Sequence, residues 1–156
     1  AGIKNTTIID STYNASFDSM AAILDLFHHF PAKTKWAIIG DMLEQGSQEQ
    51  IEHERLADQL VNLNLNQLIL YGPRVAKYTY PNLDKQIKKV VTFIYPRQVL
   101  DYLLTHLKGG ETILFKGSRF LEGVIAHLLA DKNDISKLSR REKIWEVRRK
   151  QWGLNQ

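Results

Sequence analysis

The chain has 156 residues, of which 44% are hydrophobic and 24% charged, a composition typical of a globular protein with a sizeable core. It has no cysteine, which excludes disulfides and thiolate chemistry. No apolar run is long enough to cross a bilayer, and we expect no signal peptide and a cytoplasmic protein. The formal charge of +4 comes entirely from residues 131–156, which hold eight Lys and Arg against four Asp and Glu, and the rest of the chain therefore shows no electrostatic preference for nucleic acid.

Five apolar segments are predicted to be strands, and each is followed by apolar residues at helical spacing. The predicted strands are 7–9, 36–39, 67–71, 90–94 and 112–115. We expect the first to be covered on both faces, and we expect Ile51 and Leu104 to point inward from their helices. This alternation predicts an α/β protein with a doubly wound, mostly parallel sheet, in which every strand-to-helix turn lies at one edge.

The basic last segment is predicted to be helical. Leu138, Trp145 and Trp152 recur there every seven residues. We therefore divide the chain into a domain at 1–130 and a helical tail at 131–156. Because basic and aromatic residues alternate in the tail, a nucleic-acid or protein interaction module is an alternative interpretation. The simpler interpretation is an amphipathic tail that packs on the rest of the domain, and on this interpretation we do not expect the protein to bind nucleic acid.

Polar turns follow three of the predicted strands. Asp10 to Ser16 joins the first strand to a helix, which is where open α/β folds bind ligands and where free N–H groups favour anions. Residues 116–119, Lys-Gly-Ser-Arg, offer two cations and a hydroxyl, which suit a carboxylate or phosphate, although a solvated turn capped by Ser118 is an alternative.

Asp10, Asp41 and Lys116 lie at predicted carboxyl ends of strands and could meet in one cleft. Such a set resembles a receiver-type phosphoacceptor pocket, although receivers usually begin with two adjacent acids. Ordinary turn residues are the other interpretation. The chain has no P-loop and no G-x-G-x-x-G after the first strand, so it holds no complete nucleotide site of those types. His28 and His29 point about 100° apart on a helix, and no metal site is expected.

Three ordered motifs carry a resemblance to a known family. Residues 9–20 are similar to the family pattern IDDSYNANPDSM, residues 40–46 to GDMLELG with a histidine downstream, and residues 116–119 to KGSR. Over residues 2–130 the chain thus resembles the Rossmann-like C-terminal domain of the Mur ligases, and within that family the type that adds D-alanyl-D-alanine. It departs from the pattern at Ser11, Ser16 and Phe17, where the family has Asp, Asn and Pro.

The resemblance implies an ATP-dependent amide-bond ligase of peptidoglycan precursor synthesis, acting on UDP-N-acetylmuramoyl-tripeptide and D-alanyl-D-alanine. In that family the central domain holds the P-loop and the Mg²⁺ ligands, and the N-terminal domain binds the UDP-sugar. This chain would close over ATP and position the dipeptide, with no catalytic residue of its own, and would be inactive alone. The resemblance implies nucleotide contacts from Asp10, Tyr13 and Asn14, and substrate contacts from Asp41, His53, Lys116, Ser118 and Arg119.

Overall fold

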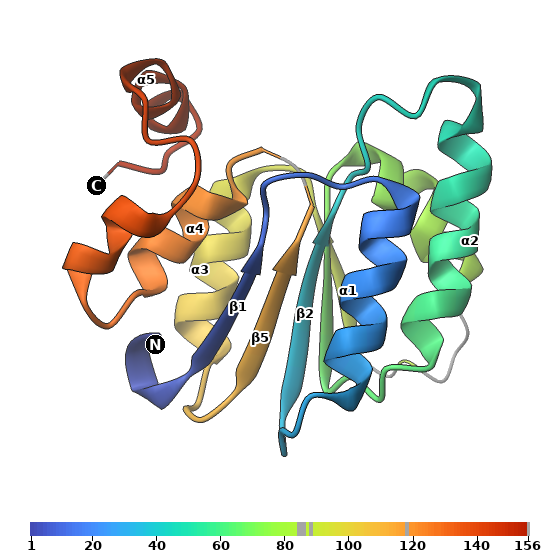
Figure 1. Ribbon diagram of the computed structural model, residues 1–156, viewed down its shortest axis with the longest axis horizontal. Coiled ribbons are helices and arrows are strands. Elements are labelled where there is room, and N and C mark those ends of the chain that lie inside the picture. The colour runs from blue at the N-terminus through green and yellow to red at the C-terminus, as the bar shows by residue number, and fades with distance from the viewer. Residues whose placement is uncertain (84–86, 88, 118, 156) are drawn as a thin grey trace.

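The computed structural model describes residues 1–83, 87, 89–117 and 119–155. In these ranges five parallel strands form one sheet in the order β1-β5-β2-β3-β4 (Figure 1). The strands are β1 (Thr7–Ser11), β2 (Lys35–Gly40), β3 (Gln67–Tyr71), β4 (Val90–Phe93) and β5 (Thr112–Lys116). The predicted α/β fold with a parallel sheet is confirmed.

Helices cover both faces of the sheet. The α-helices are α1 (Phe17–His29), α2 (Glu49–Val61), α3 (Pro96–His106), α4 (Leu121–Leu128) and α5 (Lys143–Gln151). The shorter helices are η1 (Ile3–Asn5), η2 (Gly46–Gln48), η3 (Val75–Thr79), η4 (Tyr80–Asn82) and η5 (Lys132–Lys137). Helices α1 and α2 pack on one face, and α3 and α4 on the other (Figure 1). No helix in the described ranges has the length and apolar composition needed to span a bilayer.

The strand order positions the candidate site. The chain runs from β1 past one position to β2, β3 and β4, and then returns to insert β5 between β1 and β2. Because α1 and α4 lie on opposite faces while their strands are neighbours, a crevice opens between the turns that follow β1, β5 and β2. The receiver interpretation is wrong, since that fold has its first strand inside the sheet, in the order 2-1-3-4-5.

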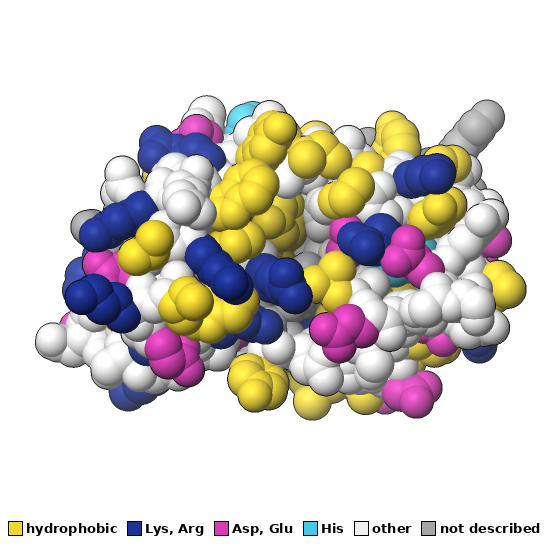
Figure 2. All heavy atoms as spheres, turned by 90° about the horizontal axis from the view of Figure 1, so that it is seen from above, with side chains coloured by type: hydrophobic (Ala, Val, Ile, Leu, Met, Phe, Trp, Pro, Cys, Tyr) yellow, Lys and Arg dark blue, Asp and Glu magenta, His cyan; other side chains and the backbone are white. Residues whose placement is uncertain are grey.

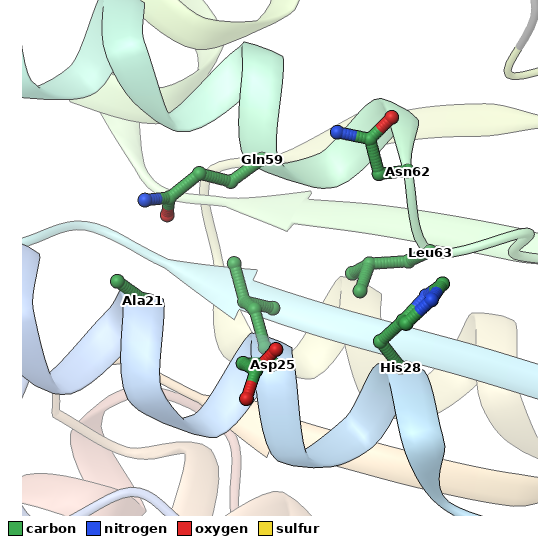
Figure 3. A pocket seen from close by; sticks show the side chains of 7 residues that line it. Ala21, Asp25, His28, Gln59, Asn62 and Leu63 are labelled. Carbon is green, nitrogen blue, oxygen red and sulfur yellow. The ribbon is translucent and has the colours of Figure 1, made fainter.

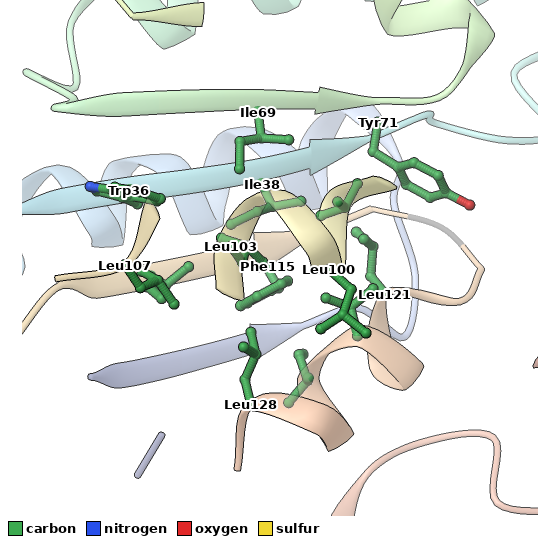
Figure 4. Close-up of a cluster of buried hydrophobic side chains, with 14 of the residues drawn as sticks. Trp36, Ile38, Ile69, Tyr71, Leu100, Leu103, Leu107, Phe115, Leu121 and Leu128 are labelled. Carbon is green, nitrogen blue, oxygen red and sulfur yellow. The ribbon is translucent and has the colours of Figure 1, made fainter. Parts of the chain in front are cut away.

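Two apolar clusters form the core, one on each face of the sheet. Side chains of successive strand residues alternate between the clusters, so Ile38 faces α3 and α4 while Ile39 faces α1 and α2. Figure 4 shows the cluster on the α3 and α4 side, in which Phe115 lies among leucines of these two helices. The expectation that β1 is covered on both faces is met only in part, since Ile8 packs against one cluster and Ile9 against the other. The strand β1 is an edge strand with Thr7 exposed and Ile8 and Ile9 half-buried.

The tail packs on the body, as its amphipathic pattern predicts. Leu154 is 2% exposed and belongs to the cluster on the α3 and α4 side. The rings of Trp145 and Trp152 lie 6.2 and 5.8 Å from the ring of Phe120. Tail and body therefore share one core, and the division of the chain at residue 130 stays a prediction.

Candidate functional site

The turn after β1 orders itself through its own side chains. Asp10 Oδ1 accepts hydrogen bonds from the backbone N–H of Thr12 at 3.0 Å and from its hydroxyl at 2.7 Å. Ser16 caps α1, because its Oγ accepts the N–H of Ser19 at 3.2 Å while Ser19 Oγ accepts the N–H of Ser16 at 2.9 Å. The hydroxyl of Ser16 is thus engaged in the cap. Tyr13, at the tip of the turn, is 77% exposed.

Cationic side chains from distant segments hold the carbonyl groups of this turn. Arg140 of the tail donates to the carbonyls of Thr12 at 3.1 Å and Tyr13 at 2.7 Å. Lys116, at the end of β5, donates to the carbonyl of Asn14. Three successive carbonyls therefore accept from the protein, while the side chains of Tyr13 and Asn14 remain exposed.

Lys116 lies beneath the turn and is 4% exposed. Burial lowers the pKa of its ammonium group, because water no longer solvates the charge fully. Lys116 thus has a backbone partner in the chain itself, and it also lines a hollow beside Asp10.

Asp41 is also buried, at 3% exposure. Its Oδ1 accepts the N–H groups of Arg74 at 3.0 Å and Val75 at 2.9 Å, and its Oδ2 accepts the Arg74 guanidinium at 3.4 Å. The carboxylate therefore caps the N-terminal end of η3, which follows β3. Asp10 and Lys116 both bond to the turn after β1 and line one hollow, whereas Asp41 bonds to the turn after β3. The three side chains therefore do not all share one cleft as the sequence suggested.

His53 is fully buried on α2. Its Nε2 accepts the N–H of Met42 at 3.1 Å, and its Nδ1 faces the carbonyl of Glu49 at 2.6 Å. One partner can only donate and the other can only accept, so the imidazole fits as the neutral Nδ1–H tautomer. His53 thus ties the loop after β2 to α2, and it does not line an open hollow.

Two hollows lie on either side of the Tyr13–Asn14 turn. The Arg119 hollow, about 380 Å³, is lined by that turn, Leu43 and Glu44 after β2, Arg119 after β5, and tail residues. The Asp10 hollow, about 430 Å³, is lined by residues 10–14 with Lys116 and the tail residue Lys137. Figure 2 looks onto this edge of the sheet and shows basic side chains gathered on the left, where the tail lies.

The structure thus brings Tyr13, Asn14 and Arg119 together in one hollow, and Asp10 and Lys116 line the other hollow with the same turn. Ser118 lies outside the described residues. The tail residues of the Arg119 hollow, which are Arg140, Glu142 and Trp145, were missed from the sequence. Their only signal was the alternation of basic and aromatic residues.

A further hollow of about 270 Å³ lies between α1 and α2, away from this edge (Figure 3). Asp25, His28, Gln59 and Asn62 border it above a floor that includes Leu63. It contains none of the predicted site residues. Within the described ranges, no group of three His, Asp or Glu side chains is arranged to hold a metal ion.

Comparison with known proteins places these turns in a family context. Residues 1–119 match the sequence model of the family described as Mur ligase, glutamate ligase domain. The UDP-N-acetylmuramoyl-tripeptide–D-alanyl-D-alanine ligase of Rickettsia prowazekii (strain Madrid E) is 35% identical over 117 residues, which is 75% of this chain and 26% of that protein. The ligase of the same name from Synechocystis sp. is 30% identical over 135 residues, 82% of this chain and 28% of that protein.

Solved structures show the same similarity. The MurF ligase from Thermotoga maritima in complex with ADP superposes with a TM-score of 0.65 at 27% identity, covering 86% of this chain and 30% of that one. MurF from Acinetobacter baumannii gives a TM-score of 0.68 at 29% identity, covering 81% of this chain and 28% of that one. The chain therefore spans between 26% and 30% of the length of these relatives.

Proposed function

The chain belongs to the Mur ligase family, whose glutamate ligase domain its residues 1–119 match, and we propose that it is the C-terminal domain of a longer ligase. This ligase uses ATP to join D-alanyl-D-alanine to UDP-N-acetylmuramoyl-tripeptide. The names of the relatives support this amine substrate. The reaction belongs to peptidoglycan precursor synthesis, and we place it in the cytoplasm. The observation that carries the proposal is the Arg119 hollow, which joins the Tyr13–Asn14 turn to Arg119.

We assign the nucleotide to the Asp10–Asn14 turn. The exposed ring of Tyr13 offers a flat face to a base. The amide of Asn14 uses its Oδ1 on the N–H of Ala15 at 2.8 Å, which leaves the amide N–H groups for a ligand. The residues present therefore fit one side of a nucleotide, and the ADP bound by the Thermotoga relative supports this fit.

ATP supplies the phosphoryl group that activates the carboxylate of the tripeptide. The described residues form no metal cluster, and the chain has no P-loop. We therefore propose that Mg²⁺ and most of the triphosphate are held by the central domain of the full-length protein, with the UDP-sugar on the N-terminal domain. This domain closes over the nucleotide and excludes water from the reacting groups.

We assign the carboxylate of the dipeptide to Arg119, whose planar guanidinium can bind it through two parallel hydrogen bonds. With its carboxylate at Arg119, the dipeptide lies in the same hollow as the Tyr13–Asn14 turn, so its amine can meet the activated carboxylate without a diffusional search. The buried residues Lys116, Asp41 and His53 support the surrounding turns through their backbone contacts. Direct substrate contact from these three is not part of this proposal.

The test is steady-state kinetics of the full-length protein with Arg119→Ala. A charge-assisted hydrogen bond contributes about 1.5–3 kcal/mol, so the KM for D-alanyl-D-alanine should rise roughly ten- to a hundredfold while the KM for ATP moves little. Arg119→Lys should also weaken dipeptide binding, because lysine lacks the bidentate fork. Lys33→Ala, which removes an exposed cation at the opposite edge of the sheet, is the matched control and should change neither constant.

If the KM for ATP rises and that for the dipeptide does not, the two turns have been assigned the wrong way round. If neither changes, Arg119 does not contact a substrate.

A further inference from the structure

We propose that Arg140, in the tail, is a positioning residue that holds the Tyr13–Asn14 turn in the orientation in which it meets a nucleotide. That the turn meets a nucleotide rests on the proposed function. That Arg140 holds the turn, which we call the clamp, rests on geometry alone. A single guanidinium donates to two successive carbonyls of the turn, those of Thr12 and Tyr13. The third carbonyl, of Asn14, is held by Lys116 from the other side.

A polar turn has little apolar surface to bury, so burial alone cannot order it against its backbone entropy. Hydrogen bonds from charged groups are among the stronger contacts that can. While Arg140 and Lys116 hold the three carbonyls, the side chains of Tyr13 and Asn14 stay exposed at the surface of the turn. A lysine at position 140 could keep the charge, but its single ammonium lacks the planar fork that spans two carbonyls.

Arg140 is itself held by several independent contacts. Its φ of 55° lies in the left-handed region, which residues with a side chain rarely adopt and which persists where the surroundings enforce it. The guanidinium of Arg149 donates to the Arg140 carbonyl at 2.7 Å. The carboxylate of Glu122, buried on α4, lies 3.7 Å from Arg140 and 3.6 Å from Arg149. The contacts with Glu122 thus hold the tail against α4 close to the place where Arg140 bonds to the turn.

The same residue borders the hollow that the turn faces. The Arg140 guanidinium lies 5.8 Å from the centre of the Tyr13 ring and 5.5 Å from that of the Trp145 ring. Trp145 and Arg140 both line the Arg119 hollow. A displacement of Arg140 would therefore release the turn and change the shape of the hollow together.

The first experiment measures amide hydrogen exchange in the 156-residue chain, comparing wild type with Arg140→Ala, Arg140→Lys and Arg148→Ala. The amides of Thr12 and Ala15 report on the turn, because each bonds to a side-chain oxygen within it. We expect both to exchange about tenfold faster or more in Arg140→Ala, equivalent to about 1.4 kcal/mol, while amides of β2 and β3 stay protected. Arg148, 4.9 Å from the Trp145 ring, is the matched control from the same tail and should leave the turn unchanged.

Arg140→Lys keeps a positive charge near Glu122. It can therefore still be measured if Arg140→Ala unfolds the protein. Faster exchange confined to the turn supports the clamp in either variant. Unchanged exchange at Thr12 and Ala15 in a folded Arg140→Lys variant would overturn it.

The second experiment measures the KM for ATP in the full-length protein with Arg140→Lys. We expect a rise of about tenfold, with the KM for the dipeptide changing less and Arg148→Ala changing neither. An unchanged KM for ATP beside faster exchange would overturn the nucleotide assignment of this turn while the clamp stands. Hydrogen exchange therefore tests the clamp, and the KM for ATP tests whether the turn binds the nucleotide.

Discussion

At the scale of single residues, Lys116 and Asp41 at strand ends and His53 on α2 show how buried polar side chains hold the turns around a candidate site. Their exposures are 4%, 3% and 0%, and each side chain bonds to the backbone of a turn. The sequence places all three near the carboxyl edge because the strand pattern fixes where each turn begins. It does not show whether a side chain turns outward or under the neighbouring loop, since that depends on contacts between turns far apart in the chain.

Gly72 is the residue that makes room for Asp41. Its φ is +122°, and a Cβ there would lie 2.5 Å from the Asp41 carboxylate. Gly72→Ala should therefore lower the free energy of unfolding in urea by about 2–4 kcal/mol, from strained backbone and the clash together. Gly110→Ala, at φ +80° with nothing within 4 Å, is the control and should lose only about 1–2 kcal/mol. Equal losses would show that the contact with Asp41 is unimportant.

The buried ammonium of Lys116 gives a pH-dependent prediction. Burial lowers its pKa in the folded protein below the ordinary value of 10.5, so between the two values the unfolded chain binds more protons. The free energy of unfolding contributed by this group therefore rises with pH through that window and levels off above 10.5. Urea unfolding of wild type and Lys116→Met across alkaline pH should show a difference that shifts in favour of wild type as pH rises. A shift in the opposite direction would mean that the folded protein stabilises the charged form.

At the scale of elements, local patterns were sufficient to locate the strands and helices, because buried segments carry their own periodicity. Two apolar residues predicted to face the core are exposed instead, Ile51 at 51% and Leu104 at 43%. On α2 the buried position goes to His53, whose ring is satisfied by backbone groups. The placement of β5 between β1 and β2 was not predictable, since strand order depends on how helices pack across the sheet and not on any local sequence signal.

The tail is the element whose interpretation the structure changes most. Two of its arginines, Arg140 and Arg149, lie beside buried Glu122, and the Trp145 ring lies beside Phe120. This arrangement favours the docked amphipathic tail over a nucleic-acid module, because these arginines are engaged by the protein.

Docking of the tail can be tested with Leu154, which is 2% exposed and would contact a Cβ added at Gly123. Leu154→Ala should lower the free energy of unfolding by about 2–4 kcal/mol, as for other buried leucines. Val147→Ala, on α5 and 50% exposed, is the matched control and should change it by about 0.5 kcal/mol or less. Thermal and urea unfolding of both variants measure this, and a loss for Leu154→Ala no larger than the control would contradict a packed tail.

At the scale of the whole molecule, we propose that these turns form one side of a larger active site in a full-length ligase. The turns after β1 and β5 could be predicted as parts of it, because their residues form compact motifs at strand ends. The contribution of Arg140 could not, since it lies 127 residues from Tyr13 and reaches it only after the tail docks on α4. The phosphate-binding loop needed for phosphoryl transfer is absent from this chain, so we assign the chemistry to an assembled ligase.

The most direct test of this account is a ligation assay on the full-length protein that contains the chain, supplied with ATP, UDP-N-acetylmuramoyl-tripeptide and one amine at a time. D-alanyl-D-alanine, D-alanine, D-glutamate and L-alanine form the panel, and product and ADP are measured together. The account predicts ATP-dependent product with D-alanyl-D-alanine far above the other amines, and none from the 156-residue chain alone. Preference for another amine, or turnover by the isolated chain, would contradict it.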